Sequence, residues 1–208
     1  MKKVRSNLIK LAAMIIICLA GTATIFAQEE TGVVINGVTW ATRNVGAVGT
    51  YAESSESHGM FYQWNRKKAL PAKSNVADMP VTTTTSTMWE AVNDPSPDGW
   101  RVPTKTEMKK LLDTTKVEYE WITTKNGVKG GRFTDKVTSK SIFLPAAGIY
   151  LDHTDSYDYG HYWTNTDANG SNAYHLTFGI GGSGLYHSNY GFGFSIRPVK
   201  NTISEKNL

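Results

Sequence analysis

Carboxylate side chains recur at intervals of three in the segment DHTDSYDYG, where Asp152, Asp155 and Asp158 stand beside His153 and Tyr157. Carboxylate oxygens grouped in this way are ligands that a hard cation such as Ca²⁺ prefers. The spacing is not that of an EF-hand, however, and no Glu follows to bind the ion through both oxygens. The pattern favours a solvated polar loop without a cofactor, and a calcium site that supports sugar binding is the alternative.

Aromatic side chains are frequent in the last third of the chain and could contact a carbohydrate. Sugar rings present CH groups that pack on exposed aromatic faces, and a tyrosine hydroxyl tolerates water. Strand alternation assigns Trp163, Phe192 and Phe194 mostly to the core. We expect the contact face in the loops around residues 152–160 and 181–190. The residues predicted to bind the ligand are Asp152, Asp155, Tyr157, Asp158, Tyr159, Tyr186, His187 and Tyr190.

No catalytic motif accompanies these residues. The five histidines form neither HExxH nor a pair at helical spacing, and GxSxG is absent. The glycines of GIGGSG precede no predicted helix, so a phosphate cradle lacks its usual context. Cys18, within the N-terminal apolar stretch, is the single cysteine, and the rest of the chain has no thiol for catalysis, zinc or a disulfide. The sequence favours a non-enzymatic protein, with a metal-dependent enzyme as the less favoured alternative.

The N-terminus has the features of an export signal. The basic leader MKKVRSNLIK precedes the apolar stretch Leu11–Ala27, which ends in a small residue. This stretch is shorter than the roughly 20 apolar residues that span a bilayer. Ile17 stands before Cys18, where lipoprotein processing requires a small residue. Residues 1–27 are therefore predicted to be a signal peptide cleaved near Ala27. The product is expected to be secreted, periplasmic or at the cell surface, without a membrane span.

The basic balance of the chain comes from this leader. The net charge is +4, and the leader holds four basic residues and no acidic one. Without it, 18 Lys and Arg residues face 18 Asp and Glu residues. A neutral domain with scattered basic residues does not attract nucleic acid. We therefore predict no nucleic-acid partner.

Strands are predicted along most of the remaining chain. Val33–Ile35 and Val38–Thr42 flank an Asn-Gly pair, which indicates a β-hairpin. Ala69–Ser86 contains two prolines and a threonine run, and is predicted to be a loop or, alternatively, an edge strand. GMFYQWNRK is expected to form a strand or a buried turn, and GIGGSG a glycine loop. Further strands are expected within YEWITT, NGVKGGRFTD, SIFLPAAGIYL, HYWTNT, AYHLTF and GFGFSIRPV.

Two helices are predicted before most of these strands. TMWEAVND indicates a short helix that ends at Asn-Asp-Pro. The stronger helix covers Thr104–Asp113, where Thr104 and Glu107 form a capping box and Met108 lies on the apolar face. Helices followed by a run of strands indicate an α+β domain. We place this domain at residues 32–200, between a polar lead at 28–31 and a polar tail at 201–208.

Several motifs in fixed order resemble the Fibrobacter succinogenes major paralogous domain family. They are VTWATRNVGA, GMFYQWNRK, NDPSPDGWRVPTKTEMKKLL, SIFLPAAG, YWTNT, AYHLTF and GFSIRPV. The resemblance runs from about Val38 to Val199, and GWRVPTxxE is its most specific part. It implies a C-type-lectin-like fold with a loop-rich face. Members commonly carry cysteines where this chain has Ser96 and Pro198, so the disulfide that they imply is absent here.

The most specific motif is predicted to stabilise the fold. We expect Trp100 to pack under the capped helix, and Arg101 or Arg197 to pair with an acidic residue such as Glu107. The residues predicted to be structural are Trp100, Arg101, Thr104, Glu107, Trp163 and Arg197.

These observations predict an exported binding module at the bacterial cell surface, which recognises a carbohydrate or a partner protein. The alternative is a structural subunit of a surface assembly such as a pilus or an adhesin. The binding module is expected to be a monomer that binds sugar. The assembly subunit is expected to present a strand edge that mediates polymerisation.

Overall fold

The chain is built mainly of short strands. The computed structural model describes residues 30–70, 86–150 and 157–201. The predicted signal peptide at 1–27 and residues 71–85 of the predicted loop lie outside these ranges. Within them the chain forms twelve strands, the helix α1 (Lys105–Leu111) and the 3-10 helix η2 (Ala91–Asn93).

The expected α+β, C-type-lectin-like class with several short helices is therefore wrong. The segment TMWEAVND forms only the 3-10 turn η2, none of whose residues is buried. A short helix gains most of its stability from an apolar face packed against the core, and η2 has none. The described chain is mainly β, arranged in several small sheets.

The first sheet joins the two ends of the domain. Its strands run in the order β1-β2-β12-β4. The predicted hairpin is confirmed, because β1 pairs with β2 across a turn in which Asn36 and Gly37 both have positive φ angles. Val199 in β12 lies opposite Trp40 in β2 and Arg101 in β4. The bounds are β1 Val33–Ile35, β2 Val38–Trp40, β4 Trp100–Arg101 and β12 Val199–Lys200.

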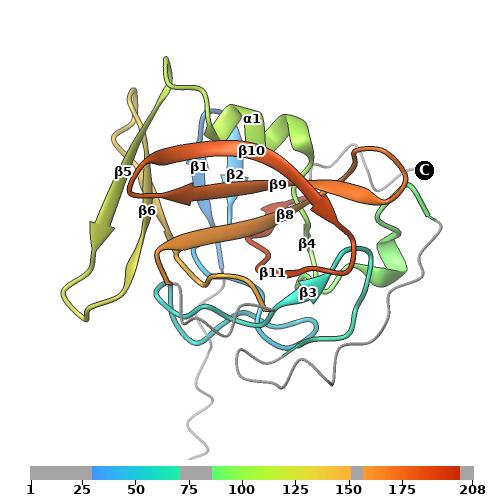
Figure 1. Cartoon of the computed structure of the whole chain (residues 1–208). Helices are drawn as coiled ribbons and strands as arrows, with labels where there is room; N and C mark the ends of the chain where they lie inside the picture. The colour runs from blue at the N-terminus through green and yellow to red at the C-terminus, as the bar shows by residue number, and fades with distance from the viewer. Residues whose placement is uncertain (1–29, 71–85, 151–156, 202–208) are drawn as a thin grey trace, which may run out of the picture.

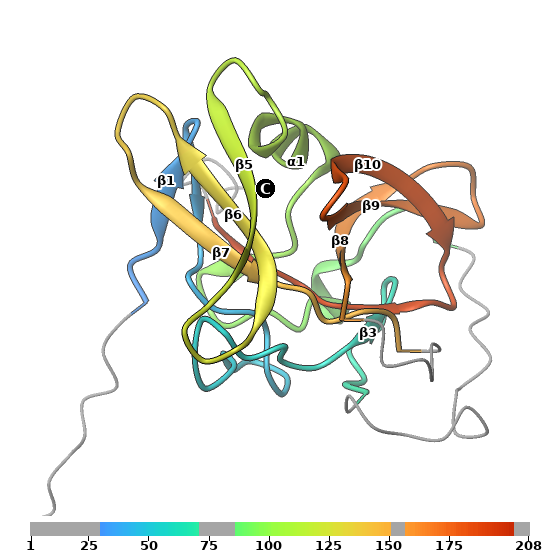
Figure 2. The same cartoon turned by 60° about the vertical axis from the view of Figure 1, so that its left-hand side comes forward.

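Two three-stranded antiparallel sheets form the body of the molecule, one on each side (Figure 2). The first consists of β5 (Val117–Thr123), β6 (Lys129–Asp135) and β7 (Ser141–Pro145). The second consists of β8 (Tyr159–Asp167), β9 (Asn172–Gly179) and β10 (Gly182–Asn189). Figure 1 shows β8, β9 and β10 side by side, with the short pair β3 (Tyr62–Gln63) and β11 (Gly193–Phe194) beneath them.

The β8–β9–β10 sheet contributes to two hydrophobic clusters. One face supplies Tyr162, Leu176 and Phe178, which pack with Met108 and Leu111 of α1. The other face supplies Trp163 and Ala173, which pack in a second cluster. The predicted core positions of Trp163 and Phe194 are confirmed, and Phe192 packs partly buried against the same cluster. The sheet is thus fixed by packing from both sides over part of its length.

The predicted capped helix is confirmed. Glu107 N donates to Thr104 Oγ1 over 3.1 Å, and Thr104 N donates to Glu107 Oε2 over 2.8 Å, which completes the capping box. The two terminal nitrogens of Arg101 donate to the two carboxylate oxygens of Glu107, each over 2.9 Å. A paired, charge-assisted contact of this kind holds both groups in one geometry. Arg101 and Glu107 therefore tie β4 to the start of α1.

The other residues predicted to be structural also lie in or near the core. Trp100 is 8% exposed and packs edge-on against Tyr51, with ring centroids 6.1 Å apart. Arg197 is fully buried and donates to Asn44 Oδ1 over 2.9 Å and to the Thr42 carbonyl over 3.0 Å. The guanidinium of Arg197 thus bonds to amide and carbonyl oxygens, while Arg101 makes the ion pair to Glu107.

Candidate binding face

One face of the β8–β9–β10 sheet carries polar and aromatic side chains in three rows across the strands. Residues opposite one another in an antiparallel sheet point to the same side, as do residues two positions apart on one strand. The rows on this face, each given in the order β8, β9, β10, are Tyr159–Gly179–Gly182, His161–Thr177–Gly184 and Trp163–His175–Tyr186. We call Tyr159, His161, Thr177 and Tyr186 the tyrosine face.

Two tyrosines of this face lie over glycines. A Cβ atom on Gly179 would stand 2.8 Å from Cδ1 of Tyr159, and one on Gly184 would stand 3.0 Å from Cε2 of Tyr186. The rings thus occupy the space that a side chain would fill. Tyr159 remains 50% exposed and Tyr186 59% exposed. Each tyrosine therefore rests on backbone and offers a large part of its surface to solvent.

A chain of hydrogen bonds links the polar groups between the tyrosines. Thr177 Oγ1 lies 3.1 Å from Nδ1 of His161 and 3.2 Å from Nδ1 of His175, and Nε2 of His175 lies 3.0 Å from Ser188 Oγ. Burial lowers the pKa of His161 to about 4 and the pKa of His175 to about 3. Both imidazoles are therefore neutral at neutral pH, and the floor of the face is polar but uncharged.

The contact between Ser188 and His175 resembles the nucleophile and base of a hydrolase. A general base works best when its pKa is near the operating pH. The pKa of His175, held at about 3, is too low for that role. His175 is also 3% exposed and packs against Phe194, with ring centroids 4.6 Å apart. His175 therefore holds Ser188 and Thr177 in place from inside the sheet.

A cavity of about 320 Å³ opens beside the first residues of β8. We call it the His58–Tyr157 pocket, after two rings that stack in its wall with centroids 5.1 Å apart. Lys129 Nζ donates to Asp158 Oδ1 over 2.7 Å at the pocket. The lining residues are His58, Gly127, Val128, Lys129, Ala146, Tyr157 and Asp158.

The sequence profile of the Fibrobacter succinogenes major domain matches residues 27–200, most of the chain. The chain belongs to this family. The resemblance drawn from GWRVPTxxE and its companion motifs is thus confirmed, and the match extends beyond Val38 toward the N-terminus. No curated protein and no solved structure matches the chain. Both the tyrosine face and the pocket lie inside the Fibrobacter succinogenes major domain.

The predicted ligand residues lie in different parts of this Fibrobacter succinogenes major domain. Tyr159 and Tyr186 lie on the tyrosine face, and Tyr157 and Asp158 line the pocket. Asp152 and Asp155 lie outside the described residues. Among the residues that the structure does describe, no three His, Cys, Asp or Glu side chains are placed to hold a metal ion. The calcium alternative, which depends on Asp152 and Asp155, stays a prediction.

Tyr190 was expected to be exposed, and that expectation is wrong. The residue is 3% exposed and stacks on Trp64, with ring centroids 4.3 Å apart and an angle of 14° between the planes. Its hydroxyl donates to the carboxylate of Asp167. Tyr190 follows the last residue of β10, where the chain turns toward β11. Tyr190 therefore belongs to the second hydrophobic cluster of the domain.

His187 lies on the face of the sheet opposite to Tyr186. It is exposed and stands across from Tyr174 of β9, with ring centroids 6.1 Å apart. The predicted set therefore divides between two faces, because successive residues of a strand alternate.

No helix in the described part of the domain is long and apolar enough to cross a membrane.

Sequence reasoning missed four polar residues of the face and the pocket: His161, Thr177, His58 and Lys129. Thr177 carried a usable signal, because it stands two residues after His175 in the predicted strand AYHLTF, and alternation places both on one face. His161 was expected to begin the strand HYWTNT, and Tyr159 was expected in the loop before it, so alternation did not join these two. His58 and Lys129 gave no such signal, because they reach the pocket only through the packing of segments distant in sequence.

Proposed function

We propose that this chain is an exported, non-enzymatic module that binds carbohydrate through the tyrosine face. The observation that carries the proposal is the placement of Tyr159 and Tyr186 over glycines on the same face of one sheet, each at least half exposed. An aromatic ring held in contact with backbone is pre-positioned to pack on the CH groups of a sugar. The leader in residues 1–27 supports an extracytoplasmic location.

The polar floor supplies hydrogen bonds that a sugar requires. Thr177 offers a hydroxyl, and neutral His161 offers a ring nitrogen. Hydroxyl and neutral imidazole groups both donate and accept, which matches the hydroxyl groups of a sugar. No charge is buried when an uncharged sugar covers this surface, so the desolvation cost is small.

The length of the face favours an oligosaccharide over a single sugar. Gly179, opposite Tyr159, and His175, opposite Tyr186, stand four residues apart on β9. At about 3.3 Å per residue, the two rows are roughly 13 Å apart along the strand. One ring cannot cover both tyrosines. The proposed ligand is therefore an extended glycan that lies along the sheet.

A glycan array tests the proposal with the chain from Gln28 to Leu208. We expect binding to oligosaccharides, and Tyr159→Ala and Tyr186→Ala each to weaken it about tenfold through loss of a stacking surface. Tyr174→Ala is the matched control, because Tyr174 lies on the opposite face of the same sheet. Absence of binding across the array, or equal binding by the Tyr159→Ala/Tyr186→Ala double variant, would contradict the proposal.

One observation favours a structural subunit as the second candidate. Strand β10 spans eight residues at the edge of its sheet. An edge strand of this length presents backbone groups that can pair with a strand from another chain. Light scattering of the purified chain over a range of concentrations separates the two candidates. Polymers that bind no sugar favour the assembly subunit, and a monomer that binds an array sugar favours the carbohydrate module.

A further inference from the structure

The His58–Tyr157 pocket has the size and rigidity of a small-ligand site. Its volume of about 320 Å³ lies at the lower end of the range, roughly 300–1,000 Å³, in which proteins hold small molecules. Such a volume suits one ring-sized unit. The pocket is therefore too small for the whole of the extended ligand proposed above.

Hydrogen bonds from several segments hold the pocket walls in place. Asn126 Nδ2 donates to Glu56 Oε2 over 3.0 Å, which ties the β5–β6 turn to the loop that carries His58. The His58 carbonyl accepts from Asn44 Nδ2 over 2.9 Å. Gly148 N donates to the Tyr159 carbonyl over 2.9 Å and fixes the start of β8. The pocket is thus preformed, which lowers the entropy lost on binding.

The polar groups at the pocket suit vicinal hydroxyl groups. Asp158 accepts hydrogen bonds and Lys129 donates them, so together they complement two neighbouring hydroxyls. Their side chains are 62% and 49% exposed, and an exposed ion pair contributes little stability. A ligand can therefore insert between them at small cost.

The charge balance of the pocket favours a neutral ligand. Lys129 and Asp158 cancel, and burial lowers the pKa of His58, which keeps that ring neutral. Tyr157 and His58 provide an aromatic wall on which a sugar ring can pack. A sugar acid would bring a carboxylate to a cation, Lys129, that Asp158 already neutralises, so its charge gains no net attraction there.

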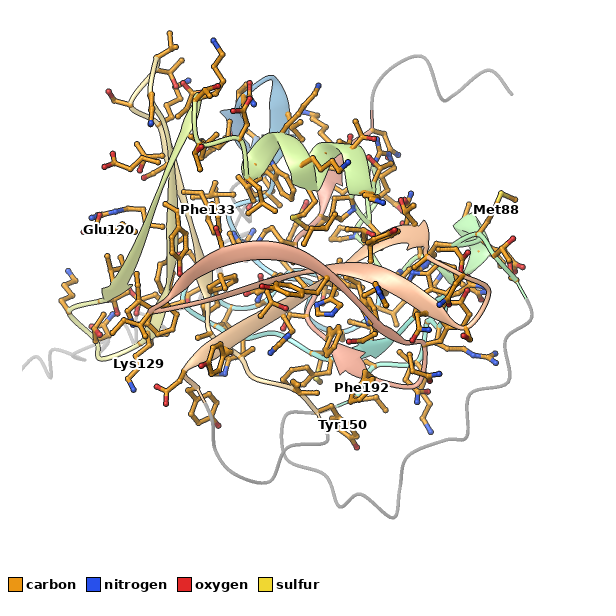
Figure 3. The ribbon with its side chains drawn as sticks, turned by 45° about the horizontal axis from the view of Figure 1, so that its top comes forward. Met88, Glu120, Lys129, Phe133, Tyr150 and Phe192 are labelled. Atoms are coloured by element: carbon orange, nitrogen blue, oxygen red, sulfur yellow. The ribbon has the colours of Figure 1, made fainter. Side chains whose placement is uncertain are left out.

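The pocket continues into the tyrosine face. Tyr157 and Asp158 directly precede Tyr159, the first residue of that face. Figure 3 shows Lys129 close to the end of the β8–β9–β10 sheet at which β8 begins. We infer that the His58–Tyr157 pocket binds the terminal neutral hexose of a glycan whose remaining units lie across Tyr159 and Tyr186. This inference rests on the proposed function.

The test is a titration of the isotope-labelled chain, followed by the amide signals of individual residues. The probes are the methyl glycosides of glucose, galactose and mannose, glucuronate as the acidic counterpart, and the oligosaccharides that bind on the array. We expect at least one neutral glycoside to shift the signals of Gly127 and Val128. Asp158→Asn and Lys129→Gln are each expected to weaken that binding about tenfold.

Glu120→Gln is the matched control, because Glu120 forms a surface ion pair with Arg132 on the same sheet as Lys129 and lies outside the pocket lining (Figure 3). That variant should bind as the unmodified chain does. Preference for glucuronate, unchanged binding by Asp158→Asn, or equal losses in Glu120→Gln would overturn the inference. Oligosaccharides that shift Tyr159 and Tyr186 but not Gly127 and Val128 would overturn the inference and leave the proposed function standing. If neither set of signals moves, both fail.

Discussion

At the scale of single residues, the neutral buried histidines beside the tyrosine face could not be predicted from the sequence. His161 and His175 share Thr177 as a hydrogen-bond partner, and their rings are 5.6 Å apart. Burial of both rings beside Phe194 disfavours the charged forms. The face thus stays uncharged only above a limiting pH, which makes its stability pH-dependent.

We expect the free energy of unfolding to fall as the pH drops below about 6.5, the ordinary histidine pKa in an unfolded chain. The unfolded state takes up a proton there, while folded His175 stays neutral down to about pH 3. The contribution of neutral His175 to the free energy of unfolding is therefore complete above about pH 6.5 and is lost as the pH falls toward 3. Urea unfolding at a series of pH values measures it.

Replacement of His175 by Gln should make that pH dependence shallower. His187→Gln is the control, because His187 is exposed on the other face of the same sheet. If both variants keep the slope of the unmodified chain, the neutral buried state of His175 is refuted.

At the scale of elements, a glycine opposite an aromatic ring constrains how β8 and β9 pair. Gly160 of β8 stands opposite Phe178 of β9, and a Cβ atom on Gly160 would lie 2.1 Å from Cζ of Phe178. Phe178 in turn packs with Phe133 and Tyr162 in the first cluster. The ring has no free space into which it can move.

Gly160→Ala should therefore destabilise the domain by about 1–3 kcal/mol, the usual cost of overpacking. Chemical denaturation followed by tryptophan fluorescence measures the change. Gly181→Ala serves as the comparison, since a Cβ atom there has no neighbour within 4 Å. Similar stability of the two variants would show that the contact between Gly160 and Phe178 does not constrain the sheet.

The elements that the sequence predicted well are those with local signals. The Asn36-Gly37 turn and the Thr104 capping box depend on residues a few positions apart, and both are present. Strand β10 is different, because GIGGSG was interpreted as a loop. Two of the first three residues of β10, Gly182 and Gly184, are glycines with weak strand propensity, and their place in the strand depends on pairing with β9. Burial of Tyr190 likewise depends on Trp64, far away in sequence.

At the scale of the whole molecule, the match to the Fibrobacter succinogenes major domain begins at residue 27, where the predicted signal peptide ends. If the leader acts as predicted, protein recovered from outside the cytoplasm begins at Gln28. N-terminal sequencing of that material checks the prediction. Replacement of Ala27 by Arg should slow processing, because signal peptidases require a small residue before the cleaved bond. Functional protein that retains residues 1–27 would contradict it.

The strand β12 has a consequence for when the domain can fold. It lies between β2 and β4, and Ala41 N donates to the Pro198 carbonyl over 2.9 Å. β2 and β4 have no strand between them to pair with until residues 198–200 have been synthesised. Contacts between such distant segments form slowly. A nascent polypeptide emerging from a ribosome therefore keeps its first hairpin and β4 apart until residues 198–200 have emerged, and this sheet does not close before then.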